Sequence, residues 1–303
     1  METKIKEIFK KIFSAEVTGI KKLSGGISFC TYKVVTETGK AYVFRYGEKY
    51  ENTGGRYIDI GQTFRREKFF FDTISNKLVL CVPHIYIVDD SHELFDYTFE
   101  IYDYIEGCSL EELTSDVNDE VYYKIGKIIA SINKIKLPND GFTEESWSSV
   151  FSKRLNERLK PLVRDNLINQ DEVKQICSYY NCFKFTEDRF FLHLDVRKGN
   201  IIYKDGIIGL IDAENAEFGD PLFELARIDV YNEMKESFYK GYMDEMGIKD
   251  INRESIQYCG YALEALAFLT NVFIHEIDAE KEIVEDLKNR TIKMKDKILS
   301  AIS

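Results

Sequence analysis

Two short apolar strands, expected on either side of a turn at residues 204–206, constrain this chain more than any other feature. His193 and Asp195 precede the pair in a His-x-Asp pattern, and Asn200 follows Asp195 by five residues. Asp212 stands at the end of the second strand, twelve residues after Asn200. Strands joined by a tight turn pair with each other, so the start of the first and the end of the second share one edge. The spacing therefore predicts that three polar side chains converge there.

Carboxylate and amide oxygens in this arrangement suit phosphoryl transfer. That chemistry requires a carboxylate to orient the attacking hydroxyl, and oxygen ligands for the magnesium ions that neutralise the phosphates. Taken alone, a His-x-Asp pattern with a later Asn also arises by chance. Whether the motif is functional therefore depends on the segments around it.

Helix and strand periodicities divide the chain into a mixed first region and a mostly helical second region. In the first we expect helices at residues 3–14 and 62–74, strands at 29–35, 41–46, 85–88 and 97–104, and a flexible break at 52–55. In the second we expect helices at residues 121–135, 145–163 and 171–180, the strand pair, and helices from 221 onward with a break at 246–247. The pattern changes between Tyr102 and Leu110. We therefore expect one lobe of residues 1–105 and another of residues 106–303.

The order of these features resembles one group of kinases. It runs from a glycine turn at residues 24–28, through a strand with Arg45 and a helix with Glu67, to the His-x-Asp motif. This plan resembles the small-molecule kinases that include aminoglycoside phosphotransferases and choline and ethanolamine kinases. The resemblance covers about residues 20–230 and is most specific from Leu192 to Ala226. It implies an α+β fold with two lobes: a small antiparallel-sheet N-terminal lobe and a mainly helical C-terminal lobe.

The resemblance also implies roles for the residues of the motif. Asp195 would orient or deprotonate the acceptor hydroxyl, while Asn200 and Asp212 would hold magnesium between the phosphates. His193 would be structural and would form a bond near the Asp212 segment. Arg197 would contact a phosphate, with an ordinary surface loop arginine as the alternative.

Nucleotide binding would fall to the first lobe, with ATP or GTP as the cofactor together with Mg²⁺. Backbone N–H groups of the glycine turn would cover the phosphates, and the backbone from Asp103 to Ile105 would pair with the base. The residues that the resemblance assigns to the nucleotide are Ser24, Gly25, Gly26, Ser28, Arg45, Glu67, Asp103 and Ile105.

Two positions depart from the usual pattern of these kinases. Most carry Lys where Arg45 stands, whereas choline kinases carry Arg, and a guanidinium can form a fork to a phosphate and to Glu67. An exposed strand arginine is the alternative. Glu224 stands where the family more often has Asp, and it would support the site together with Asp220.

The net charge of −11 is unevenly distributed. Residues 1–105 carry 15 basic and 15 acidic side chains, so the whole excess of acid falls on the remainder. An acidic region argues against a nucleic-acid partner and suits a cationic small molecule, although a surface that only promotes solubility would explain it too. From this charge we expect Glu233, Glu236 and Glu264 to meet the ammonium groups of a substrate.

Other compositional features bear on location and assembly. No apolar run is long enough to span a bilayer, so we expect no membrane partner. The first residues lack the apolar stretch of a secretion signal, and the six cysteines show no paired spacing. We expect a cytoplasmic protein with reduced thiols, present as a monomer or weak dimer.

Three functions remain open on the sequence. The first is magnesium-dependent phosphorylation of an aminoglycoside, and hence antibiotic resistance. The second is a choline- or ethanolamine-type kinase, which Arg45 favours. A quaternary ammonium requires an aromatic cage, and the single tryptophan, Trp147, lies outside the best-matched segment. Other aromatic residues could form the cage instead: Tyr258, Tyr261, Phe268 and Phe273. The third is a nucleotide-binding pseudokinase. The presence of Asp195, Asn200 and Asp212 argues against the third.

Overall fold

The computed structural model describes residues 1–23, 29–47, 50–53, 56–113, 117–136, 145–186, 188–277 and 279–303. The chain divides into two compact units. Unit 1 comprises Met1–Thr53, Tyr57–Leu113 and Gly199–Asn215, and unit 2 comprises Gly54–Arg56, Thr114–Lys198 and Ala216–Ser303.

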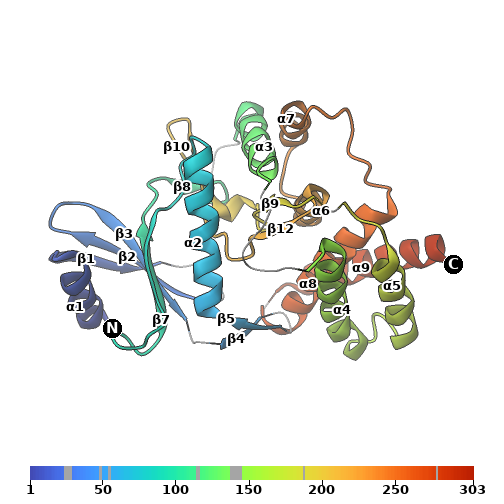
Figure 1. The fold of residues 1–303 in the computed structure, drawn as a ribbon, viewed down its shortest axis with the longest axis horizontal. Coiled ribbons are helices and arrows are strands. Elements are labelled where there is room, and N and C mark those ends of the chain that lie inside the picture. The colour runs from blue at the N-terminus through green and yellow to red at the C-terminus, as the bar shows by residue number, and fades with distance from the viewer. Residues whose placement is uncertain are drawn as a thin grey trace. The chain divides into compact units, whose positions relative to one another are not determined.

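Unit 1 is built on a five-stranded antiparallel sheet of order β1-β2-β3-β7-β6. Its main elements, labelled in Figure 1, are α1 (Glu2–Phe13), β1 (Val17–Lys22), β2 (Cys30–Thr36), β3 (Ala41–Gly47), α2 (Ile60–Lys77), β6 (Ile85–Asp89) and β7 (Thr98–Asp103). The expected break at 52–55 is wrong in part, because residues 52–53 belong to a strand. That strand, β4 (Tyr50–Thr53), forms a small separate sheet with β5 (Arg56–Asp59). Residues 54–55 lie outside the described residues.

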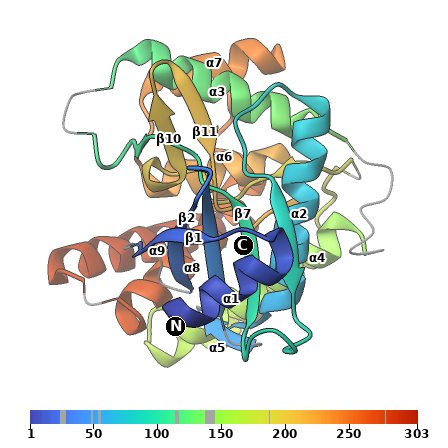
Figure 2. The ribbon, with the colours of Figure 1, turned by 90° about the vertical axis from the view of Figure 1, so that its left-hand side faces the viewer.

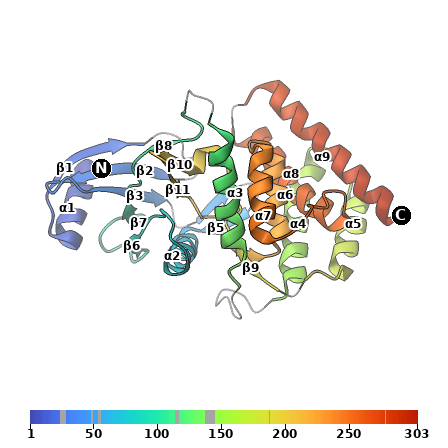
Figure 3. The ribbon, with the colours of Figure 1, turned by 90° about the horizontal axis from the view of Figure 1, so that it is seen from above.

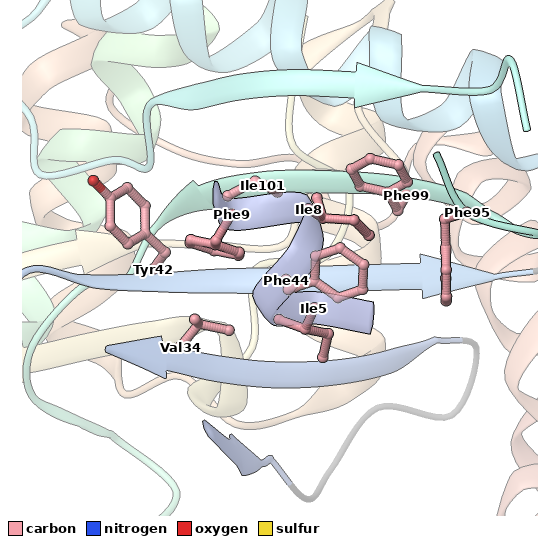
Figure 4. Close-up of a cluster of buried hydrophobic side chains, with 9 residues drawn as sticks. All are labelled: Ile5, Ile8, Phe9, Val34, Tyr42, Phe44, Phe95, Phe99 and Ile101. Atoms are coloured by element: carbon pink, nitrogen blue, oxygen red, sulfur yellow. The ribbon is translucent and has the colours of Figure 1, made fainter. Parts of the chain in front are cut away.

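One face of the five-stranded sheet forms the apolar core of unit 1. Val34, Phe44 and Ile101 on the strands pack against Ile5 and Phe9 of α1, as Figure 4 shows. Figure 2 shows α1 lying across the strands on this face. The apolar residues of α1 recur at helical spacing, so a single stripe of the helix can cover the sheet.

The opposite face carries charge, because successive side chains of a strand point to opposite sides of a sheet. Phe44 and Ile101 form a cross-strand pair on the apolar face, so the next pair, Arg45 and Glu100, points to the other face. Helix α2 covers that face (Figure 1) and contributes the buried Glu67. The sheet thus separates an apolar layer from a polar one.

The strand pair of the motif belongs to unit 1. Strands β10 (Ile201–Lys204) and β11 (Ile207–Leu210) pair as expected, and β10 also pairs with β8 (Cys108–Ser109). The backbone N–H of Leu210 donates to the C=O of Cys81 at 3.0 Å. This grouping differs from the expected division at residue 106, because pairing between segments far apart in the chain leaves no local sequence signal.

Unit 2 is mainly helical. Its elements are α3 (Asp119–Asn133), α4 (Trp147–Arg164), α5 (Gln170–Cys182), β9 (Phe190–Leu192), β12 (Glu217–Gly219), α6 (Pro221–Tyr231), α7 (Glu236–Met246), α8 (Ile256–His275) and α9 (Lys281–Ile302). A short 3-10 turn, Lys198–Asn200, joins the two units. Side-chain N-caps explain several helix starts: Asn118, Ser146, Asn169 and Ser255 each accept a hydrogen bond from the first turn.

Helices α3 and α7 lie side by side (Figure 3) and approach closely through two glycines. A Cβ atom at Gly126 of α3 would lie 2.0 Å from the carbonyl oxygen of Phe238, and one at Gly241 of α7 would lie 2.0 Å from that of Tyr123. Each glycine therefore allows the backbone of the other helix to approach.

The expected α+β fold is confirmed, with an antiparallel sheet in the N-terminal region and helices in the C-terminal region. None of the described helices combines the length and apolarity needed to cross a bilayer.

Candidate active site

Arg45 is the centre of a buried charge cluster in unit 1. Its guanidinium forms an ion pair with Glu67 of α2, its Nε donates to Glu100 Oε1 at 2.7 Å, and its Nη1 donates to Asp212 Oδ1 at 3.0 Å. The expected contact between Arg45 and Glu67 is present. The alternative of an exposed strand arginine is wrong, because Arg45 is only 4% exposed.

The cluster contains more carboxyl groups than cations. Burial raises the pKa of Glu100 to about 8, although Arg45 opposes this, and burial also raises the pKa of Glu67. Burial alone would lower the pKa of Arg45, but the charges of Glu100 and Glu67 hold it above its usual value. The buried Oε2 of Glu100 has no hydrogen-bond partner. One guanidinium therefore does not satisfy these carboxyl groups.

Asp212 and Asn200 come together within unit 1 through β10 and β11. The backbone N–H of Ile211 donates to the C=O of Asn200 at 3.1 Å, and Asp212 follows in a left-handed conformation with φ 64°. The next N–H, of Ala213, donates to Glu67 Oε1 at 3.0 Å. Contacts on both sides therefore hold a non-glycine residue in a conformation that few residues adopt.

The donor set fits magnesium. No group of three or more His, Cys, Asp or Glu side chains gathers into a metal site within the described part of the chain. Mg²⁺ does not need one, since it is usually held by one or two carboxylates together with substrate phosphates and water. Asp212 and Asn200 offer oxygen atoms, and a divalent cation would offset the excess of carboxyl groups around Arg45.

In unit 2, helix α6 holds the backbone of the His-x-Asp segment. The Glu224 carboxylate accepts from the N–H of His193 at 2.6 Å and from the N–H of Leu194 at 2.7 Å. Arg227 Nε donates to the C=O of Leu194 at 2.9 Å. Leu194 has φ 60°, a left-handed conformation that costs roughly 1–2 kcal/mol in a residue with a Cβ atom. The two buried side chains of α6 stabilise it.

Asp195 follows directly and is 7% exposed. Its N–H donates to His193 Nδ1 at 3.2 Å, so His193 supports the loop from within. Its carboxylate accepts from the Tyr231 hydroxyl through Oδ1 at 2.9 Å and faces Arg197 Nε through Oδ2 at 3.4 Å. The carboxylate is therefore held by side chains on both oxygens.

The chain matches the model of a known protein family. The sequence model of the phosphotransferase enzyme family matches residues 19–252, which is more than half of the chain. The chain belongs to this family. Together with its kinase-like fold, this membership makes the protein a small-molecule phosphotransferase. A search of curated proteins found no match.

Solved structures of the same fold include kinases of two kinds. A protein from Haemophilus somnus 129PT, provisionally named fructosamine-3-kinase, shares 17% identity with a TM-score of 0.73, over 99% of this chain and 98% of that one. Aminoglycoside phosphotransferase APH(4)-Ia shares 14% identity with a TM-score of 0.68, over 98% of this chain and 99% of that one. A thermostable mutant of that enzyme, in ternary complex with ADP and hygromycin B, shares 15% identity with a TM-score of 0.67, over 97% of this chain and 98% of that one.

The predicted nucleotide residues of this phosphotransferase are only partly described. Ser24, Gly25, Gly26 and Ser28 lie outside the described residues. Asp103 ends β7, and its side chain accepts from the Tyr86 hydroxyl at 2.8 Å. Ile105 follows in the segment between β7 and β8.

The expectation for Glu264 is corrected by its surroundings. Glu264 is fully buried, and its carboxylate faces Arg154 at 2.6 Å, Arg227 at 3.2 Å and Arg158 at 3.4 Å. A side chain enclosed by three arginines cannot meet a substrate ammonium group. Burial would raise its pKa, but the three guanidinium charges outweigh burial and lower the pKa to about 2.

The other two candidate substrate residues differ from Glu264. Glu233 is partly buried and accepts from the backbone N–H of Lys198 at 2.6 Å. Glu236 is exposed in the first turn of α7. Both lie in unit 2, and their part in acceptor binding stays a prediction.

Three residues of these clusters were not anticipated from the sequence: Glu100, Arg227 and Tyr231. Glu100 stands in an apolar strand pattern, where only its pairing with Arg45 explains a buried charge. For the other two a signal exists. Glu224, Arg227 and Tyr231 follow one another by three and four residues, which puts them on one face of a helix.

Proposed function

We propose that this kinase transfers the γ-phosphate of ATP, with Mg²⁺, to a hydroxyl group of a cationic small molecule, and we favour an aminoglycoside. The observation that carries the proposal is the support of Asp195. Its loop is held by Glu224 and Arg227, and its carboxylate by hydrogen-bonding side chains. Such a fixed carboxylate can accept the hydrogen bond of an acceptor hydroxyl and take its proton during transfer.

The remaining residues of the proposed site would bind the metal ion and the phosphates. Asp212 and Asn200 would hold Mg²⁺, which when bound neutralises charge on the phosphates. Arg45 holds Asp212 in place and leaves the cluster with the excess carboxyl groups that favour a divalent cation. Arg197, whose side chain is 37% exposed and faces Asp195, would contact a phosphate.

A cationic acceptor agrees with the acidity of residues 106–303. Electrostatic attraction raises the encounter rate of an oppositely charged ligand. Two of the kinase groups with this fold are named for amine-bearing acceptors, which supports testing aminoglycosides and fructosamines first. A choline-type acceptor is less well supported, because Trp147 is fully buried and donates to the Tyr261 hydroxyl at 2.8 Å instead of lining an aromatic cage.

The first experiment measures ADP release with ATP and Mg²⁺ over an acceptor panel. The panel holds hygromycin B, other aminoglycosides, a fructosamine, choline, ethanolamine and a neutral sugar. We expect turnover with an amine-bearing acceptor, and in Asp195→Asn a kcat reduced by roughly 10²–10⁴-fold with nucleotide affinity nearly unchanged. Asp205→Asn, in the exposed turn between β10 and β11, is the control that keeps full activity. Wild-type kcat in Asp195→Asn would refute the assigned role.

The second experiment tests the metal ligands. Asp212→Asn should weaken the binding of ATP in the presence of Mg²⁺ and leave binding without Mg²⁺ nearly unchanged, because an amide is a poorer ligand for a hard cation. Calorimetric titrations with and without the ion measure both. If Asp212→Asn and Asp205→Asn show the same magnesium dependence as the wild type, Asp212 is not a ligand.

A further inference from the structure

Helix α6 presents three polar side chains to the His-x-Asp segment from one face. Glu224 and Arg227 bind the backbone of residues 193–194, and Tyr231, one turn further on, reaches the next side chain, Asp195. The first two contacts hold the backbone, and the charge of Arg227 also acts on Asp195. Of the three α6 side chains, Tyr231 is the one with a hydrogen bond to an oxygen of the carboxylate.

The Tyr231 contact distinguishes the two oxygens of Asp195. The Tyr231 hydroxyl donates to Oδ1 at 2.9 Å, whereas Oδ2 faces Arg197 Nε at 3.4 Å. A hydroxyl–carboxylate bond at a site that is 7% exposed is charge-assisted and weakly screened. It therefore restrains the carboxylate more firmly than the longer contact from Arg197, whose side chain is partly exposed.

Tyr231 acts as a donor and not as a base. Its burial and the adjacent Asp195 charge raise the pKa of Tyr231, and Arg227 opposes them only in part. The hydroxyl consequently keeps its proton at neutral pH. Arg227 is itself fixed by Glu264, at 3.2 Å, so a continuous set of buried contacts leads from α8 to Asp195.

We propose that Tyr231 is a positioning residue of the phosphotransferase reaction: its hydrogen bond to Oδ1 fixes the Asp195 carboxylate so that Oδ2 receives the acceptor hydroxyl. The inference rests on the proposed function, because it assigns Tyr231 a role through Asp195.

The test compares Tyr231→Phe, which removes only the hydroxyl, with the wild type. A carboxylate that rotates freely spends less time in the reactive orientation, so kcat should fall by roughly 10- to 100-fold, the usual effect of losing a hydrogen bond to a charged group. The KM for ATP should stay within about two-fold, because binding does not depend on that orientation. The assay uses ATP, Mg²⁺ and the panel acceptor that reacts, with ATP hydrolysis, where water is the acceptor, as a second readout.

The matched control is Tyr258→Phe. The Tyr258 hydroxyl also donates to an aspartate, but its acceptor is Asp229 of α6 instead of Asp195. Both variants lose one tyrosine–carboxylate bond, so their losses of thermal stability should be similar, whereas Tyr258→Phe should keep kcat within about two-fold. Equal kcat values in the two variants would overturn the proposal.

A double variant separates this inference from the proposed function. If Tyr231 acts through Asp195, Tyr231→Phe should have no further effect on turnover in an Asp195→Asn background. A full additional loss would show that Tyr231 acts elsewhere, and where the double variant is too slow to measure, the comparison with Tyr258→Phe decides. Full activity of Asp195→Asn would overturn the proposed function, whereas full activity of Tyr231→Phe with an inactive Asp195→Asn would overturn only the positioning role.

Discussion

At the scale of single residues, this kinase has two buried charge clusters, one with more carboxyl groups than cations and one with more cations than carboxyl groups. Arg45 in unit 1 is one cation facing three carboxyl groups, and Glu264 in unit 2 is one carboxylate facing three arginines. The excess cations in unit 2 stack on aromatic rings, with Arg158 4.3 Å from the ring of Phe268. The excess carboxyl groups in unit 1 agree with the Mg²⁺ binding that we propose for Asp212 and Asn200.

Glu264→Gln should be strongly destabilising. The substitution removes the carboxylate that Arg154, Arg158 and Arg227 share, and breaking a buried pair in this way typically costs about 3–5 kcal/mol. Urea unfolding of the two proteins measures the loss. The control is Glu145→Gln, whose exposed partner Lys153 lies at 2.6 Å and whose removal should cost less than about 1 kcal/mol. Equal effects of the two substitutions would contradict the assigned role of Glu264.

The stability contributions of Glu264 and Glu224 should depend on pH in opposite senses. The pKa of Glu264, about 2, is below the ordinary 4.5, so its contribution is present above pH 4.5 and is lost as the pH falls towards 2. Burial raises the pKa of Glu224 to about 7, so its contribution is full below pH 4.5 and is lost as the pH rises through 7.

The prediction for Glu224 can be tested by comparing the stability of the wild type with that of a Glu224→Gln variant. Relative to Glu224→Gln, the wild type should lose stability on the order of 2 kcal/mol between about pH 5 and 7.5. Urea unfolding at each pH gives the two curves. Glu111→Gln, at an exposed position, is the control and should follow the wild type throughout. A difference that grows in the opposite direction would show that the folded protein prefers ionised Glu224.

At the scale of elements, close packing of α3 on α7 depends on residues that disfavour helices. Glycine in a helix interior costs about 1 kcal/mol relative to alanine. Gly126 and Gly241 nevertheless stand inside these helices, each facing the backbone of the other. The packing that they permit must outweigh this cost, and it places the start of α7, with Glu236, beside α3.

Gly241→Ala should destabilise the protein although alanine favours the helix. The new methyl group would overlap the Tyr123 carbonyl, and the helices must separate, at a net cost of about 1–3 kcal/mol. Chemical unfolding measures the change. Gly19→Ala in β1 is the control, because its methyl group would meet Val35 at an ordinary 3.7 Å. A stabilised Gly241→Ala would show that the helices are not in close contact in solution.

At the scale of the whole molecule, charge is divided along the chain. Residues 1–105 are neutral and the remainder carries −11. If that acidity attracts the acceptor, its effect must weaken as salt screens it, because the screening length is about 10 Å at 0.1 M and shorter at higher ionic strength. A surface that serves only solubility would show no such dependence.

We therefore expect kcat/KM for an amine-rich acceptor to fall several-fold as ionic strength rises from about 0.05 to 0.5 M, with a smaller change in the KM for ATP. A steady-state series at constant free magnesium measures this, with a neutral sugar acceptor as the control. Phosphorylation of the neutral acceptor alone, or no effect of salt on the cationic one, would remove the charge argument for an aminoglycoside.

Local patterns were sufficient to predict the element types, and they also singled out the chemical motif, whose roles stay a prediction. Helix α1 and strands β2, β3, β6 and β7 lie close to where periodicity predicts them, because spacings of 3.6 and 2 residues record which side of an element is buried. The motif could also be found in the sequence, since Asp195, Asn200 and Asp212 are near neighbours in the chain. The same spacing argument could also have singled out Arg227 and Tyr231 on α6.

Other features depended on contacts between distant segments. Glu100 is a partner of Arg45 because β3 and β7 pair in one register, residues 199–215 join unit 1 because β10 pairs with β8, and Glu264 is enclosed because α4, α6 and α8 meet around it. Periodicity shows that a side chain points inward but not which other side chain it meets there. Glu264, which composition alone assigned to a substrate, is a buried counter-ion for this reason. The sequence determines its charge, but the packing of the helices determines its neighbours.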